Sequence, residues 1–147
     1  MCGKGDQNSF PFKLFICFFT MTIGLVLMPC TDLQKHITLS FKKGLIDDYF
    51  LVKNRNTNYF GEILVYLSFA MCTGKLIGYV ILIVIWCLLF GSRIYLKECS
   101  LKKKEGYKRY KMNSYLILFK FFDNDVVNYV IHGVWICFLV YCCCFYF

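Results

Sequence analysis

The chain has 147 residues, of which 59% are hydrophobic and 20% aromatic, and its mean hydropathy is +0.55. Soluble domains are roughly half apolar, and so short a chain has too little interior to bury this surplus, so the composition excludes an ordinary soluble domain and predicts an integral membrane protein. The net charge of +8, from 17 Lys and Arg against 9 Asp and Glu, is gathered in two clusters beside apolar runs, which indicates a cytosolic membrane face and no nucleic-acid partner.

The first apolar run covers residues 14–28 and is shorter than the roughly 20 residues that a spanning helix prefers. A cleaved signal peptide and a retained helix both fit this run. The segment after Pro29 and Cys30 lacks a small-residue cleavage site, and the remaining chain is itself rich in apolar residues. We therefore expect a retained N-terminal transmembrane helix in residues 1–30 that runs on towards Leu33.

Two basic segments flank the next apolar run. Residues 31–62 are polar and show no sustained helical period, so we expect a loop there. Residues 93–111 form the second basic segment, in which the run of three lysines at 102–104 is expected to be a solvated face near acidic lipids. Both segments should face the cytosol under the positive-inside rule.

The apolar segment 63–91 must connect two loops on the same side of the membrane, which requires an even number of crossings. As one helix it would be about 43 Å long, against a hydrocarbon core of about 30 Å. We therefore predict a helical hairpin at about residues 63–94, with Gly74, Lys75 and Gly78 at its turn, where the lysine reaches the far interface. A single tilted helix with a snorkelling lysine is the alternative.

Two apolar stretches follow the second basic segment. Residues 115–122 are too short to cross a bilayer and are expected at the interface or against other helices. Residues 126–147 are long enough to span and would form an extra C-terminal hydrophobic helix within residues 124–147. This helix carries His132, for which a bond to a carbonyl near the membrane edge is expected; a proton relay is the alternative.

Most of the ten cysteines are scattered singly, and no CxxC pair recurs with nearby histidines. We therefore expect neither a disulfide framework nor a metal site. The run Cys142, Cys143 and Cys144 is expected to be lipid-facing thiols, with palmitoylation near the bilayer surface as the alternative.

Three motifs carry a resemblance to a known family. The segment NRNTNYFGEILVY at residues 54–66 resembles the RHPNYFGE or RNPNYLGE signature of the steroid 5-alpha-reductase-like membrane family. Upstream, TDLQKHITLSFKKGLIDDYF is similar to the family's ADxQK helix end, and downstream, SRIYLKECSLKKKEGYKRY is similar to its closing element, in which an acidic residue and a leucine precede PGYxxY. The motifs occur in the family's order over roughly residues 24–122, the C-terminal half of a usual member.

This resemblance and the apolar pattern predict one fold class: an all-α, multi-pass transmembrane helical bundle with a helical hairpin and cytosolic loops. Residues 31–123 would form the reductase-like C-terminal domain, closed by the motif at residues 93–122. The expected location is a membrane, and the endoplasmic reticulum in a eukaryote.

The resemblance also implies an active site. Glu62 would lie beside the nicotinamide and the substrate, with Tyr59 as its catalytic partner. The residues implied to bind the cofactor supply an amide, phenols, a carboxylate and phosphate-binding guanidinium groups; they are Arg55, Asn58, Tyr59, Arg93, Glu98, Tyr107 and Tyr110. For the last two tyrosines, anchoring at the membrane interface is the alternative.

The implied reaction is an NADPH-dependent reduction of a CH–CH group in a lipid-like substrate. Hydride would pass to the beta carbon of an enone, and a nearby acid would protonate the developing enolate. Arg93, Ile94 and Glu98 also fit the R-I-x-x-E-E tail of isoprenylcysteine carboxyl and phospholipid methyltransferases, for which S-adenosylmethionine would be the cofactor. The glutamate of NYFGE favours reduction.

The chain also departs from the reductase pattern. Asn56 and Thr57 stand where the family has His-Pro or Asn-Pro, and the family's N-terminal helices have no counterpart here. A non-catalytic truncated relative or membrane subunit is therefore the alternative from a different class. A partner chain supplying the missing helices is a further expectation.

Overall fold

The fold of the described residues is entirely helical. The computed structural model describes residues 6–146, with side chains described for residues 11–135 and 137, and this part of the chain contains no strand. Two of its helical stretches, Pro11–Phe41 and Leu76–Leu101, are long and apolar enough to cross a membrane. Only 17% of the most apolar window of each is buried. Both stretches therefore present apolar side chains outward, unlike the core helix of a soluble protein.

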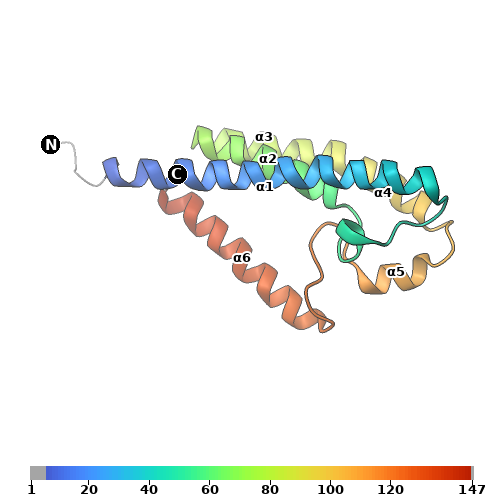
Figure 1. The fold of residues 1–147 in the computed structure, drawn as a ribbon. Helices are drawn as coiled ribbons and strands as arrows, with labels where there is room; N and C mark the ends of the chain where they lie inside the picture. The colour runs from blue at the N-terminus through green and yellow to red at the C-terminus, as the bar shows by residue number, and fades with distance from the viewer. Residues whose placement is uncertain (1–5, 147) are drawn as a thin grey trace.

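The first helix, α1 (Asp6–Phe41), runs along the whole bundle (Figure 1). It does not end near Leu33 but continues to Phe41, so the loop expected at residues 31–62 was wrong at its start. Residues 31–41 contain no proline or glycine, and their backbone can therefore keep helical hydrogen bonds beyond the apolar run. The helix ends three residues before Gly44, whose φ of 143° favours glycine.

The hairpin prediction is confirmed in outline. Helix α2 (Thr57–Thr73) ends at Gly74, whose φ of 59° is left-handed, and Lys75 precedes the returning arm. That arm consists of α3 (Leu76–Ile85), a π-helical stretch η2 (Trp86–Phe90) and α4 (Gly91–Leu101). Both arms extend beyond the predicted hairpin limits, and the irregular segment before α2 shrinks to residues 42–56, with a short 3-10 turn η1 (Tyr49–Leu51).

Two glycines let α1 and α2 pack closely. A Cβ atom placed on Gly24 would lie 2.6 Å from the carbonyl oxygen of Gly61. A Cβ atom placed on Gly61 would lie 2.8 Å from the amide nitrogen of Met28. Both contacts are with backbone atoms, which cannot rotate away as a side chain can. The crossing therefore requires glycine in both helices, as in small-residue packing between membrane helices.

The chain continues through α5 (Tyr107–Asn113) and an irregular segment, residues 114–124, to α6 (Asp125–Tyr146), which lies at an angle to the other long helices (Figure 1). The irregular segment packs against other helices as expected: the rings of Phe119 and Phe60 lie 5.5 Å apart in an edge-to-face contact. His132 Nε2 lies 2.9 Å from the Phe119 carbonyl oxygen, which confirms the carbonyl-bonded interpretation. The side chains at 142–144 lie outside the described ones, so lipid-facing thiols stay a prediction and palmitoylation its alternative.

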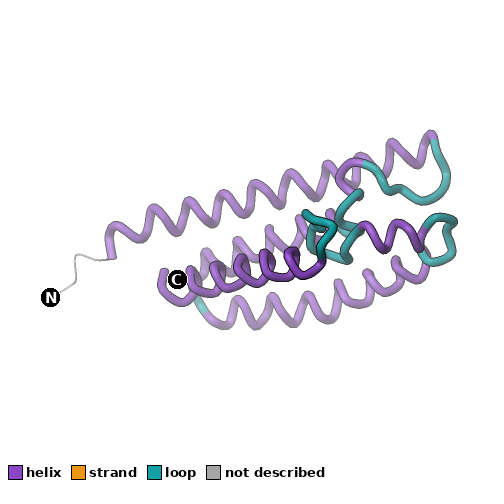
Figure 2. The backbone as a smooth tube through the Cα atoms, turned by 90° about the horizontal axis from the view of Figure 1, so that it is seen from below, coloured by secondary structure: helices purple, strands orange, loops and turns teal. Residues whose placement is uncertain are grey.

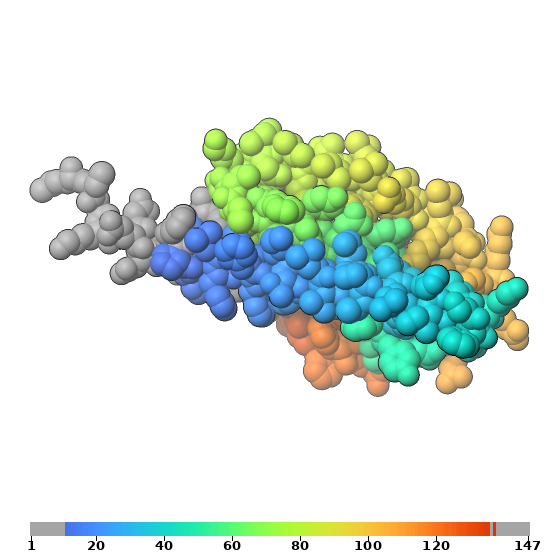
Figure 3. Space-filling model, turned by 45° about the horizontal axis from the view of Figure 1, so that its top comes forward, coloured from blue at the N-terminus to red at the C-terminus, as the bar shows by residue number. Residues whose placement is uncertain are grey.

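The irregular segments gather at one end of the molecule, which we call the polar end. Residues 42–56, 102–106 and 114–124 all lie there, and the hairpin turn lies toward the opposite end, as Figure 2 shows. The space-filling view shows α1 lying along the hairpin for the length of the body, with α6 emerging beneath it (Figure 3). The two segments that carry the family motifs thus meet at the same end of the bundle.

Candidate functional site

The candidate site is built on residues 54–57, four consecutive polar residues that are buried. Buried polar groups require hydrogen-bond partners, and here the partners come mainly from the segment after α5. The Arg55 amide donates to the Tyr115 carbonyl at 3.0 Å, and the Asn56 side-chain amide donates to the Leu116 carbonyl at 2.8 Å. The Asn54 side-chain amide donates to the carbonyl of Ile117. These bonds hold residues 54–56, just before NYFGE, against residues 115–117.

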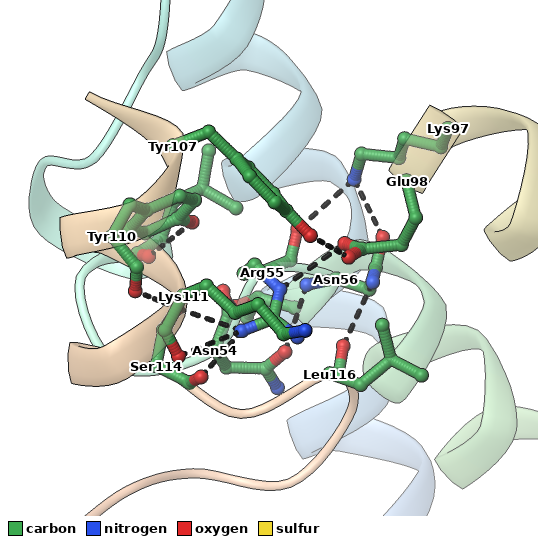
Figure 4. A network of polar contacts seen from close by, with 12 residues as sticks. Asn54, Arg55, Asn56, Lys97, Glu98, Tyr107, Tyr110, Lys111, Ser114 and Leu116 are labelled. Carbon is green, nitrogen blue, oxygen red and sulfur yellow. Dashed lines mark hydrogen bonds and ion pairs between the residues drawn. The ribbon is translucent and has the colours of Figure 1, made fainter. Parts of the chain in front are cut away.

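Arg55 connects three parts of the polar end (Figure 4). Its side chain is 6% exposed, and its Nε atom lies 3.1 Å from a carboxylate oxygen of Glu98 in α4. Its Nη1 atom donates to the Ser114 carbonyl and, at 3.4 Å, to the carbonyl of Lys111 in α5. The structure therefore gives the guanidinium group internal partners, and its expected role in holding a phosphate stays a prediction.

Tyr107 and Tyr110 are buried, which makes anchoring at the membrane interface the wrong alternative. The Tyr107 hydroxyl donates to the second carboxylate oxygen of Glu98, and the Tyr110 hydroxyl donates to the Leu51 carbonyl at 2.6 Å. Burial, followed by the bond to Glu98, raises the pKa of Tyr107, and burial raises the pKa of Tyr110. Both phenols are therefore protonated donors at neutral pH.

Lys97 is a site residue that sequence reasoning missed. Its ammonium donates to the Asn56 side-chain oxygen at 2.7 Å and to the Arg55 carbonyl at 3.0 Å. It also lies 5.5 Å from the centre of the Tyr59 ring, within cation–π range. The signal in the sequence was a lysine next to Glu98 at the end of an apolar helix, where a charge needs a partner.

A small basic cavity lies beside this network, between α1, residues 42–56 and α4. Its volume is about 200 Å³, and four cationic side chains line it without an acidic one: Lys35, Arg55, Lys97 and Lys104. Lys35 pairs with Asp32 at 3.2 Å, and the Lys104 ammonium donates to the Gly44 carbonyl at 2.6 Å. Such an excess of positive charge suits a phosphate or another anion.

The remaining predicted residues lie along the start of α2 and the facing arm. Tyr59 packs edge-to-face on Phe90, with 5.6 Å between ring centres, and Glu62 follows three residues later on the same side of the helix. Arg93 and Asp32 are charged neighbours of Glu62. The side-chain oxygen of Asn58 is buried and has no hydrogen-bond partner among the described residues, so it remains available as an acceptor.

The two motif segments are thus joined by direct contacts. Within the described residues, no group of three His, Cys, Asp or Glu side chains is placed to hold a metal ion. No protein-family model, curated protein or solved structure matches the chain. The resemblance to reductases therefore rests on the sequence motifs.

Proposed function

We propose that the protein crosses the membrane several times, with α1, both arms of the hairpin and α6 as its spans and the polar end in the cytosol. Exposed apolar side chains on the spans support this, among them Phe18 at 64% and Leu76 at 79%. The 17 residues of α2 extend about 25 Å and the returning arm about 39 Å, against a core of about 30 Å. In a eukaryote, the endoplasmic reticulum is the proposed location.

We further propose that the polar end binds NADPH and that the protein reduces an enone in a lipid-like substrate. The observation that carries this proposal is the basic cavity at the place where the two motif segments meet. Its cationic side chains suit the phosphates of the dinucleotide, and the free acceptor of Asn58 suits an amide donor. NADPH would supply the hydride when bound.

The side chains of the protein would supply the position and the proton. Lys97, whose ammonium lies 5.5 Å from the centre of the Tyr59 ring, would hold that ring in place, and the phenol would donate the proton to the developing enolate. Glu62, near Arg93, lies one turn further along α2 and would complete the reactive face. Arg55, Glu98 and Tyr107 would hold these groups in place through their own contacts.

A second candidate is a non-catalytic membrane subunit, and one observation favours it. The polar atoms of Arg55, Glu98 and Tyr107 bond to each other, as expected if the motif only fastens the loop to α4 and α5. In that case the missing helices of the family would belong to a partner chain. Binding of a cofactor distinguishes the two candidates.

The test is to titrate the full chain, purified in detergent, with NADPH and separately with S-adenosylmethionine. We expect saturable binding of NADPH, and Lys35→Met should weaken it about tenfold because one charged contact is lost. Lys102→Met is the matched control, since Lys102 is exposed and does not line the cavity. Binding of S-adenosylmethionine alone would select the methyltransferase alternative, and binding of neither would leave the subunit.

A further inference from the structure

A second cavity, apolar and larger, lies between the hairpin and α6. Its volume is about 580 Å³, within the range of about 300–1,000 Å³ typical of small-molecule pockets. Its walls come from α2, the start of η2, residues 115–118 and the first half of α6. An adjoining cavity of about 300 Å³ shares four of its lining residues, Phe60, Leu118, His132 and Trp135. Together they make an extended apolar space between the hairpin and α6.

One residue of the cavity wall carries a buried polar atom without a partner among the described residues. The indole nitrogen of Trp86 is buried and has no hydrogen-bond partner among the described residues. Two other polar side chains of the cavity wall are engaged: the Tyr115 hydroxyl donates to Asp125 at 2.6 Å, and His132 lies 2.9 Å from the Phe119 carbonyl. A buried N–H group without an acceptor is costly, so an occupant that brings an acceptor would be favoured.

The position of Trp86 in the chain supports a binding role. It is the first residue of η2, and π-helical turns inside longer helices occur often at functional sites because they redirect a side chain. An occupant that combines a long apolar body with an acceptor for this indole suits the cavity wall. An ester-linked acyl chain has both properties. Lipid acyl chains also surround any helical bundle that spans a membrane.

We propose that this cavity binds one acyl chain of a membrane lipid, whose ester carbonyl accepts a hydrogen bond from Trp86. The inference does not depend on the reductase reaction, because the cavity and the basic site have no lining residue in common. A protein that fails to bind NADPH would therefore still be expected to bind the acyl chain.

The two tryptophans of the chain provide the readout, because Trp86 and Trp135 both line the cavity. The full chain in detergent is titrated with a lysophosphatidylcholine whose acyl chain carries bromine, a quencher of indole fluorescence. We expect saturable quenching at one lipid per chain. The ether-linked analogue, which lacks the carbonyl, should bind about threefold to tenfold more weakly.

Variants separate the cavity from the outer surface. Leu67→Phe fills the cavity and should abolish the saturable phase. Leu88 lies on the returning arm, is 68% exposed and does not line the cavity, so Leu88→Phe should leave that phase unchanged. Trp86→Phe should remove the preference for the ester while Trp135 still reports binding. Quenching that rises without saturation, or that Leu67→Phe does not alter, would overturn the proposal, as would equal affinity for ester and ether.

Discussion

Replacing Gly24 or Gly61 by alanine is expected to destabilise the protein by about 2 kcal/mol, because the added methyl group would meet backbone atoms of the facing helix. Neither helix can relieve a contact of 2.6 or 2.8 Å by rotating a side chain, so α1 and α2 must move apart. The separation would also pull α1 away from the start of the NYFGE helix. The loss of stability is measured by unfolding the protein in detergent while its circular dichroism is recorded.

The chain offers a matched control for this substitution. Gly133 lies inside α6, and a Cβ atom placed there would meet no heavy atom within 4 Å. Gly133→Ala should therefore be neutral, or stabilise by up to about 1 kcal/mol through its higher helix propensity. Equal stability of Gly24→Ala and Gly133→Ala would contradict the close packing of α1 against α2.

Replacing Arg55 by methionine should cost about 3–5 kcal/mol, because it leaves the carboxylate of Glu98 in a largely buried place without its cation. The substitution also removes the guanidinium donors to the carbonyls of Ser114 and Lys111. Thermal unfolding of the detergent-solubilised chain gives the change in stability. Arg109→Met is the matched control, since Arg109 is exposed and the same substitution there should have little effect.

A double substitution shows whether the ion pair itself carries the effect. Adding Glu98→Met to Arg55→Met removes the uncompensated charge, so the pair of changes should cost less than the sum of the single ones. Strict additivity would mean that the two side chains do not interact, and would contradict the network at the polar end.

The sequence predicted the hairpin well because its evidence is local. An apolar run too long for one crossing, interrupted by Gly74 and Lys75, places a turn by length and charge alone. The end of α1 was not predictable in the same way. Residues 31–41 have the polar composition of a loop, yet they contain no glycine or proline to stop the helix, which continues to Phe41.

The candidate site shows where sequence reasoning reached its limit. The motifs indicated the two segments that meet, but the contacts that join them run from the side chains of Asn54 and Asn56 to main-chain carbonyls about 60 residues away in the chain. Periodicity carries no information on such pairs. Likewise, Gly61 appears in the sequence only as part of the NYFGE motif, whereas its position against Gly24 gives it a role in helix packing.

Labelling of single cysteines in sealed vesicles tests most directly whether the two motif segments lie on one face of the membrane. Lys53→Cys, Lys103→Cys and Lys75→Cys would each be made in a chain whose native cysteines are replaced by serine, and treated from outside with an impermeant maleimide. We predict equal accessibility at positions 53 and 103 and the opposite accessibility at position 75. Opposite accessibility at 53 and 103 would contradict the shared polar end and the function proposed for it.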